Sequence, residues 1–392
     1  MYSPSLLRRF FCFNSASSSS VTTFSSTNSK KMSLVFFGSP QVSATVLDAL
    51  FNASAAPSSS FEVAAIVTQP PSRRDRGRKL MPSPVAQHAL DRGFPSELIF
   101  TPERAGESGG RRRPTNFLSF VFFLSETFLS SLRALQPELC ITAAYGNILP
   151  TKFLNIPSLG TVNIHPSLLP FYRGAAPVQR ALQDGVKETG VSLAFTVRDL
   201  DAGPVIARER LEVDDQIKAS DLLALLFCKG SKLLINKLPS IFDGSAKVNA
   251  EPQDDSKATL APKITPEESW LSFDEEALVL HNKVRAFAGW PGTRAKVLVV
   301  DDKSSNHNVL ELKIITTIVR PDYKIQGNDV NDITFVKGAL LFPCGGCTAL
   351  EETFILYIKA VNDKLAESNF LISNSYNQRL FLSFLVSLVC WS

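Results

Sequence analysis

Two side chains that could act on a carbonyl group lie close together near the middle of the 392-residue chain. Asn163 and His165 occupy the apolar segment 161–165, whose β-branched residues predict a short buried strand. Side chains two residues apart in a strand point to the same face, so the amide and the imidazole would be neighbours. An amide can donate to a developing oxyanion, and an imidazole can take or give a proton near neutral pH. The same pattern also fits an Asn that caps a turn and a His that is hydrogen-bonded within a core.

The segment after this predicted strand is stiff. Pro166 and Pro170 cannot donate to a sheet ladder, so they end the strand and restrict the loop that follows. In an open α/β sheet, ligands bind beyond the ends of strands, where such loops begin. This position favours a functional role for Asn163 and His165.

The run from Asn163 to Pro170, NIHPSLLP, resembles the signature of enzymes that use 10-formyltetrahydrofolate as formyl donor. The continuation at 172–177, YRGAAP, followed by Gln179 and Arg180, is similar to that of methionyl-tRNA formyltransferases. The resemblance implies transfer of a formyl group to the α-amino group of methionyl initiator tRNA. Two alternatives remain, namely a folate-dependent formyltransferase or hydrolase with a small substrate, and an inactive RNA-binding relative or splice product.

A carboxylate farther along the chain completes the implied site. Asp201 lies in the run Leu200–Gly203, and aspartate in such a run commonly hydrogen-bonds to its own backbone in a turn. The formyltransferases carry Leu-Asp-x-Gly at this distance from the Asn/His pair, so the resemblance implies Asp201 as the third catalytic residue. Asp199 is the neighbouring carboxylate that could be mistaken for it. Asn163 would hold the oxyanion and His165 would move a proton, while the carboxylate would orient the imidazole and stabilise its protonated form. This direct transfer requires neither a metal nor a serine or cysteine nucleophile.

The resemblance also implies a folate pocket made by two loops. One loop follows a strand predicted at 139–144, and the other is the stiff loop after His165. The implied folate-contacting residues are Tyr145, Gly146, Ile148 and Leu149 in the first loop and Ser167, Leu168, Leu169 and Pro170 in the second. For the first loop, a simple strand-to-helix turn explains the glycine and the proline equally well.

A basic stretch at 73–79 holds five cations and one anion between flanking prolines, which predicts an exposed loop. A solvated run of charge is one explanation, and contact with nucleic-acid phosphates is the other. The stretch resembles the loop that methionyl-tRNA formyltransferases insert at the acceptor stem of initiator tRNA, so we expect RNA contact, with Arg76 as the leading candidate. The cations are Arg73, Arg74, Arg76, Arg78 and Lys79.

An apolar run at 34–37, a helical pattern at 42–51 and a second apolar run at 61–67 predict strand, helix and strand. This order opens a doubly wound sheet, which continues through strands and a long helix expected at 139–144, 189–197, 204–211 and 219–238. We therefore expect an α/β, Rossmann-like catalytic domain with a mostly parallel sheet over residues 32–244. Gly38-Ser39-Pro40 is not a Gly-x-Gly-x-x-Gly fingerprint, so no dinucleotide is expected.

A polar, proline-containing stretch at 245–266 predicts an inter-domain linker. Beyond it, residues 267–350 resemble the carboxy-terminal domain of the same family, with a helix expected at 276–287. Alternating patterns predict the short strands of a small OB-like β-barrel at 296–300, 309–319 and 332–342. Such barrels bind nucleic acid on a basic face, but here the cations are spread out and a solvated surface explains them equally well.

Three segments depart from the pattern of a compact enzyme. Residues 1–31 are rich in Ser, contain Arg and lack acidic residues, which is typical of an organellar transit peptide and predicts the mitochondrion, with a plastid as the alternative. Residues 108–124 join a basic stretch to an apolar run too short to cross a bilayer, so we interpret them as an insertion, with a membrane-touching hairpin as the alternative. Residues 351–392 do not resemble the family and end in an apolar tail.

The amino-acid composition says less about function than the motifs do. Apolar residues make up 44% of the chain, which is ordinary for a globular protein, and a net charge of +4 does not by itself demand nucleic acid. The six cysteines are scattered, which favours a reducing compartment. Cys344 and Cys347 have the spacing of half a zinc site, but no second pair stands near them, and the two glycines between them favour a tight turn. We expect a monomer without metal, DNA or stable membrane association.

Overall fold

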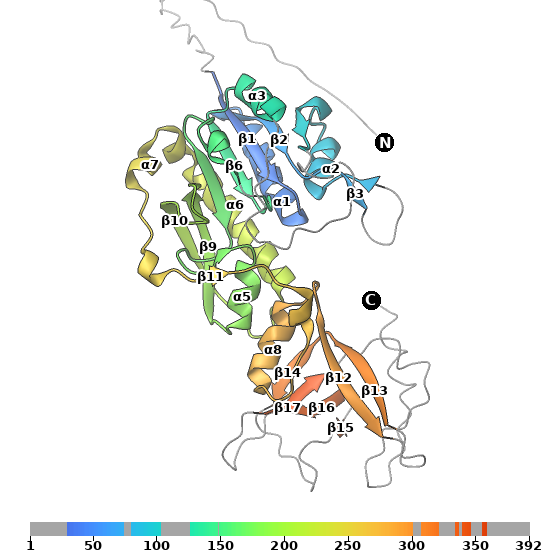
Figure 1. Cartoon of the computed structure of the whole chain (residues 1–392). Coiled ribbons are helices and arrows are strands. Elements are labelled where there is room, and N and C mark those ends of the chain that lie inside the picture. Colours follow the sequence, from blue (N-terminus) through green and yellow to red (C-terminus); the bar gives the residue numbers. More distant parts are fainter. Residues whose placement is uncertain are drawn as a thin grey trace, which may run out of the picture. The chain divides into compact units, whose positions relative to one another are not determined.

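The computed structural model describes residues 30–73, 80–102, 126–147, 149–300, 307–320, 334–336, 339–345 and 355–358. Most of the predicted transit peptide, the whole predicted insertion and most of the predicted tail lie outside these residues. In the described part, a layered α/β domain is followed by a smaller domain made mostly of strands (Figure 1). None of the described helices combines the length and hydrophobicity needed to cross a bilayer.

A seven-stranded sheet forms the middle layer of the first domain, in the order β10-β9-β7-β6-β1-β2-β5. The five strands from β7 to β5 run parallel, while β9 is antiparallel to both of its neighbours. This topology confirms the predicted doubly wound, mostly parallel sheet. The strands are β1 (Met32–Gly38), β2 (Phe61–Val67), β5 (Ile99–Phe100), β6 (Leu139–Ala143), β7 (Thr161–His165), β9 (Glu188–Phe195) and β10 (Val205–Glu212).

Helices cover both faces of this sheet, and β1 shows how the sequence produces that arrangement. Leu34 and Phe36 are fully buried on the face covered by α1 and α6. Val35 and Phe37 are fully buried on the other face, which α3 covers. A strand buried on both faces needs a continuous apolar run, and burying each large side chain contributes about 1.5–3 kcal/mol. The helices are α1 (Gln41–Ser54), α2 (Pro84–Asp91), α3 (Glu126–Ala134), α4 (Thr151–Leu154), α5 (Pro177–Gln183) and α6 (Ala219–Phe242).

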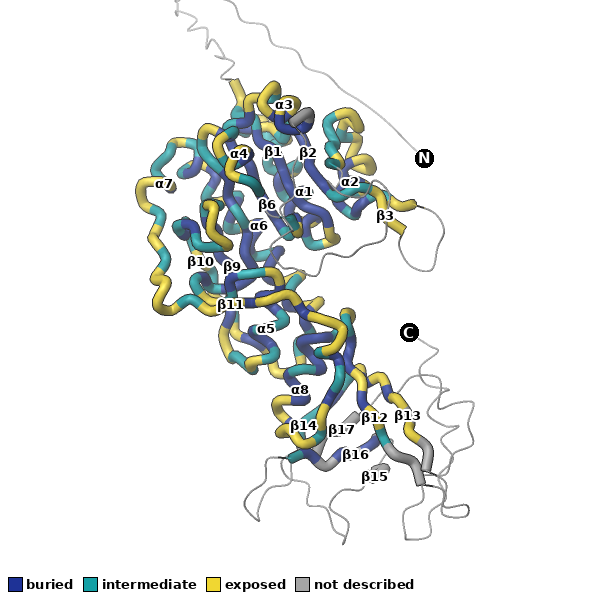
Figure 2. Tube along the Cα trace, in the orientation of Figure 1, coloured by how far each residue is buried: buried dark blue, intermediate teal, exposed yellow. Residues whose placement is uncertain are grey.

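The segment predicted as a linker, 245–266, carries structure of its own. It holds α7 (Ser245–Asn249), a 3-10 turn at Asp255–Lys257 and β11 (Leu260–Ala261). β11 pairs in parallel with β8 (Arg173–Gly174), in the loop that follows β7. The tube in Figure 2 is mostly exposed along the part of this segment that leads to β11. Ala261 in β11 is fully buried. The pairing joins segments far apart in sequence, so the composition of the linker could not reveal it.

The second domain has a separate apolar core around α8 (Ala277–Ala286). Its described strands form two sheets, β12-β13 and β14-β17-β16-β15. The single strand expected at 309–319 is wrong, because the chain leaves β13 at Ile315 and re-enters as β14, which pairs with β17 instead of β12. The strand expected at 332–342 is likewise two strands, β15 and β16, which pair with each other. The strands are β12 (Thr293–Val300), β13 (His307–Ile314), β14 (Thr317–Arg320), β15 (Thr334–Val336), β16 (Ala339–Pro343) and β17 (Ile355–Ile358).

Candidate active site

Asn163 is held in place by a threonine on the neighbouring strand. Thr142 lies opposite Asn163 in the parallel pair β6/β7, and the Thr142 hydroxyl donates to Asn163 Oδ1 at 2.7 Å. On its other side, Asn163 Nδ2 lies 3.4 Å from Asp201 Oδ1. The reverse orientation of the amide would bring two oxygens to that distance, so the nitrogen faces the carboxylate. The second N–H of this amide can then donate to a substrate oxygen.

His165 is buried at the end of β7, with 4% of its side chain exposed. Its Nε2 lies 2.9 Å from the backbone carbonyl oxygen of Tyr172. Because a carbonyl can only accept, Nε2 carries the hydrogen, and in the neutral ring Nδ1 carries the lone pair. Nδ1 faces Asp201 Oδ2 at 3.7 Å, which is an ion-pair distance rather than a hydrogen bond. The carbonyl of Tyr172 therefore orients the imidazole, and Nδ1 is the atom that can exchange a proton with a substrate.

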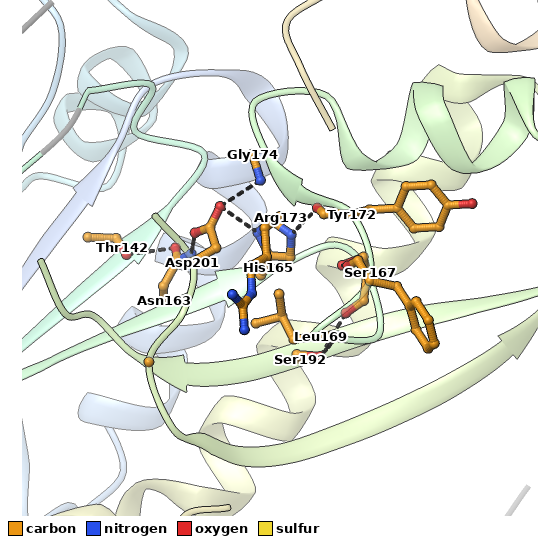
Figure 3. Close-up of polar contacts among 12 residues, drawn as sticks. Thr142, Asn163, His165, Ser167, Leu169, Tyr172, Arg173, Gly174, Ser192 and Asp201 are labelled. Atoms are coloured by element: carbon orange, nitrogen blue, oxygen red, sulfur yellow. Dashed lines mark hydrogen bonds and ion pairs between the residues drawn. The ribbon is translucent and has the colours of Figure 1, made fainter. Parts of the chain in front are cut away.

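Asp201 reaches the other two residues from the loop between β9 and β10 (Figure 3). The backbone N–H of Gly174 donates to Asp201 Oδ2 at 2.9 Å, so the loop after β7 holds the carboxylate. Asp201 has a φ of 49°, a left-handed conformation that aspartate adopts more readily than most residues because its side chain is short and polar. Its side chain is 16% exposed against 4% for His165, so solvent has greater access to the carboxylate.

The structure thus places Asn163 within hydrogen-bonding distance of Asp201 and His165 within ion-pair distance of it. Asn163 and His165 come from one strand, and Asp201 comes from a loop two strands later in the chain. Asp199, the alternative carboxylate, is exposed. An amide donor, a proton-exchanging imidazole and a carboxylate at one point can stabilise an oxyanion and accept a proton from an attacking amine.

The predicted folate loop after β7 contains both buried and half-buried side chains. Ser167 is fully buried, and its hydroxyl donates to a carbonyl of the same loop at 2.6 Å. Leu169 is 2% exposed and packs on β9 and β10. Leu168 and Pro170 are half-buried. The first two side chains shape the loop from within, and the other two leave apolar surface that a ligand can contact.

The other predicted folate loop follows β6. The Tyr145 ring packs edge-on against Phe37, with 5.3 Å between ring centroids, and is 4% exposed. Gly146 is exposed at a φ of 79°, which favours glycine, and Leu149 is half-buried. Ile148 lies outside the described residues.

The two loops emerge at the same edge of the sheet, because β6 and β7 are parallel neighbours. Leu149 in the first loop, and Leu168 and Pro170 in the second, are half-buried apolar residues of these loops.

A short antiparallel hairpin carries the predicted RNA-contacting loop. β3 (Ser72–Arg73) pairs with β4 (Leu80–Met81), and all four residues are exposed. Arg73 pairs with Leu80 and is therefore the last paired residue before the loop. The remaining predicted cations, Arg74, Arg76, Arg78 and Lys79, lie outside the described residues.

Within the described part of the chain, no cluster of three or more His, Cys, Asp or Glu side chains could hold a metal ion. Cys344 of the predicted half zinc site is buried, and its thiol donates to a backbone carbonyl, while Cys347 lies outside the described residues. Burial raises the pKa of the Cys140 thiol, which disfavours the thiolate that a covalent mechanism would need.

The groups that hold the predicted catalytic side chains were not themselves predicted from the sequence. Thr142 belongs to an apolar strand, and only the register between β6 and β7 gives its hydroxyl a role. The carbonyl of Tyr172 and the N–H of Gly174 are backbone groups within the signature run. A sequence carries no sign of which backbone groups will face a site.

The chain is similar to known proteins over most of its length. Residues 32–238 match the family described as Formyl transferase, and residues 263–355 match Formyl transferase, C-terminal domain. A methionyl-tRNA formyltransferase from Sulfurihydrogenibium sp. is 34% identical over 287 residues, which cover 72% of this chain and 81% of that protein. The chain belongs to the methionyl-tRNA formyltransferase family.

Other members of the family are similarly related. The methionyl-tRNA formyltransferase of Thermosynechococcus vestitus is 38% identical over 272 residues, which cover 68% of this chain and 73% of that protein. Among solved structures, the sugar 3N-formyl transferase WlaRD aligns with a TM-score of 0.54 at 14% identity, over 84% of this chain and 97% of that one. An N-formyltransferase from Helicobacter canadensis aligns with a TM-score of 0.53 at 14% identity, over 83% of this chain and 98% of that one. At these identities the two structures show a shared fold.

Proposed function

We infer that this chain transfers a formyl group from 10-formyltetrahydrofolate to the α-amino group of methionyl initiator tRNA. The observation that carries this conclusion is membership of the methionyl-tRNA formyltransferase family, with relatives aligned over most of their length. The close approach of Asn163, His165 and Asp201 supplies the chemistry.

Asn163 is suited to hold negative charge on the formyl oxygen. Bound 10-formyltetrahydrofolate supplies the formyl carbon that the amine attacks. Because the Thr142 hydroxyl fixes the amide oxygen, the amide nitrogen points toward Asp201 and the reacting group. A donor fixed before the reaction loses little energy to reorganisation, and one such donor typically contributes on the order of 3 kcal/mol to the transition state.

His165 and Asp201 are suited to handle the proton. The attacking amine must lose one proton as the new C–N bond forms, and the departing folate nitrogen must gain one. His165 Nδ1 can take the first proton, since the ring already donates through Nε2 to Tyr172. The Asp201 carboxylate, 3.7 Å from Nδ1, would stabilise the resulting imidazolium. The same nitrogen can then return a proton to the leaving group.

Different parts of the chain are proposed to bind the formyl donor and the tRNA. The family uses a formyl-tetrahydrofolate, and we propose that the folate lies along the loops after β6 and β7, against Leu149, Leu168 and Pro170. We propose that the basic hairpin contacts tRNA phosphates through Arg73 and the cations up to Lys79. The second domain belongs to the same family of enzymes and would extend the tRNA contact.

We further propose that the enzyme acts in an organelle, with the mitochondrion favoured over a plastid. The Ser-rich, Arg-containing and acid-free composition of residues 1–31 supports this location. We also propose that it acts as a monomer, without DNA and without stable membrane association.

The direct test is formylation of initiator Met-tRNA by the purified chain with 10-formyltetrahydrofolate carrying a labelled formyl group. We expect labelled formyl-Met-tRNA. Tight Met-tRNA binding without transfer would instead indicate an inactive RNA-binding relative, and formylation of small amines alone would indicate a different acceptor. A variant lacking residues 108–124, assayed in parallel, tests whether that segment affects activity.

A further inference from the structure

Residues 251–261, which we call the strap, hydrogen-bond to both loops that carry the catalytic machinery. The strap begins at Glu251, whose backbone N–H and carbonyl pair with Val205 at 2.9 and 2.8 Å. Farther along, the Thr259 carbonyl accepts from the N–H of Arg173 at 2.9 Å, and the Thr259 hydroxyl accepts from the N–H of Tyr172 at 2.8 Å. Tyr172 is the residue whose carbonyl orients His165. The segment between the domains therefore forms part of the active-site scaffold.

Gln253 makes the central contact of the strap. Its Nε2 donates to the backbone carbonyls of Asp201 and Gly203, both at 2.7 Å. Its Oε1 accepts from Arg173 Nε at 2.9 Å. One side chain thus uses both of its amide hydrogens and its oxygen to join the loop that carries Asp201 to the loop that follows β7.

The two loops joined by Gln253 also contact each other at the catalytic carboxylate. Gly174, next to Arg173, donates its N–H to Asp201 Oδ2 at 2.9 Å. The strap lies directly behind this glycine, because a Cβ added there would stand 2.6 Å from the carbonyl oxygen of Ala261. Gln253 and Gly174 therefore hold Asp201 at two points, one on its backbone and one on its side chain.

Burial and charge distinguish Gln253 from the rest of the strap. The residues on either side of it, from 251 to 257, are exposed, whereas Gln253 is half-buried. Its partner Arg173 is 8% exposed, and the guanidinium also donates to Asp255 Oδ1 at 2.8 Å. An amide is the side chain that can serve a cation and two carbonyls at once, because it offers an acceptor and two donors. A linker that served only as a tether would not need that chemistry at this position.

We propose that Gln253 is a positioning residue for formyl transfer, which sets the distance between the Asp201 carboxylate and His165 by holding the Asp201–Gly203 backbone against Arg173. The proposal rests on the proposed function, and it assigns part of that function to the segment between the domains. Gln253 need not touch the substrate, because it acts on the reaction through Asp201.

Two substitutions separate this role from a general contribution to folding. Gln253→Met keeps the length of the side chain and removes all three hydrogen bonds, whereas Gln253→Glu keeps the acceptor for Arg173 and removes the donors to the two carbonyls. Gln216→Glu, at an exposed position in the loop before α6, makes the same change of charge away from the strap.

We expect the single-turnover rate at saturating substrates to fall roughly 10- to 100-fold in both Gln253 variants, as for a small misplacement of a reacting group. We expect the Kd for Met-tRNA to stay within about twofold, because the variants keep the tRNA-contacting surfaces.

A second readout does not depend on activity. Amide hydrogen exchange in peptides covering 170–176 and 197–206 should be faster in Gln253→Met than in the wild type or in Gln216→Glu, with exchange in the second domain unchanged. If the wild type forms no formyl-Met-tRNA, the proposed function fails, and this exchange experiment still decides whether Gln253 holds the two loops. Wild-type rates and exchange in both Gln253 variants would overturn the proposal, as would a loss of rate matched by a loss of folding throughout the chain.

Discussion

The loops proposed to carry the catalytic residues and the hairpin proposed to contact tRNA are built in opposite ways. In the first, His165 is almost fully buried and its ring is fixed by a backbone carbonyl, while Asp201 is held by Gly174 and Gln253. In the second, every described residue of β3 and β4 is exposed, and only two residue pairs join the strands. Proton transfer requires groups held to a fraction of an ångström, whereas attraction between cations and phosphates tolerates movement. Substitutions in the first region should therefore affect rate, and those in the second should affect affinity.

A large effect that separates the regions should come from Asn163→Ala. Removing the amide takes away the donor to the formyl oxygen, so the single-turnover rate should fall roughly 10²–10³-fold. The Kd for Met-tRNA should change little, because the loss falls on the transition state. A rate within threefold of wild type would show that another group holds the oxyanion.

A smaller effect of the same kind is expected from Thr142→Val. Valine keeps the shape of the side chain but loses the hydroxyl that donates to Asn163 Oδ1 at 2.7 Å. The amide can then rotate away from its productive orientation, so we expect a fall in kcat of roughly tenfold with little change in KM. Thr142→Ser, which keeps the hydroxyl, should restore most of the rate. Equal losses in the two variants would indicate that packing by the missing methyl group matters instead.

Arg76→Ala should show the opposite pattern. Loss of one phosphate contact should weaken Met-tRNA binding severalfold and reduce the slope of log K against log salt by about 1. The single-turnover rate at saturating tRNA should remain close to wild type. Lys232→Ala removes a charge from an exposed position on α6 and should leave the salt slope unchanged. An unchanged slope in Arg76→Ala would remove the hairpin from the tRNA interface.

The smallest effect concerns stability, and it tests whether polar side chains are also held in a fixed geometry away from Asn163, His165 and Asp201. His281 on α8 is 5% exposed, with Nδ1 2.8 Å from the Thr317 hydroxyl and Nε2 2.9 Å from the carbonyl oxygen of Asp215. Burial lowers the pKa of His281 below its ordinary value of 6.5. As the pH falls below about 6.5, the unfolded chain therefore takes up a proton that the folded chain does not, so this contribution to stability declines.

The measurement is the urea midpoint at pH 7.5 and at pH 5.5. Wild type should lose more stability on acidification than His281→Gln, whose side chain does not titrate. The same pH dependence in both proteins would show that His281 does not contribute to it.

Prediction from sequence succeeded where local pattern decides structure. The continuous apolar run at 34–37 was enough to predict the buried strand β1. The spacing of Asn163 and His165 in β7 was enough to predict that both side chains lie on one face. It failed where distant segments meet. The turn at Ile315 lies within an alternating pattern, so nothing local marks the change of sheet.

For the same reason, the sequence could not predict the residues that hold the proposed catalytic side chains in place. The role of Thr142 depends on register between two strands, and that of Gln253 depends on a segment some 50 residues beyond Asp201 folding back over it. Asp201 itself was predicted only from the resemblance to known enzymes, because an Asp-x-Gly run alone indicates only a turn.

The measurement that tests the central claim most directly is the single-turnover rate of formyl transfer by His165→Ala at saturating Met-tRNA and 10-formyltetrahydrofolate, with the Kd for Met-tRNA measured on the same preparation. The loss of the group that exchanges the proton should lower the rate roughly 10²–10⁴-fold and leave the Kd within about twofold. A rate near that of the wild type, or a Kd that weakens as much as the rate falls, would contradict the assignment of His165 to the chemistry.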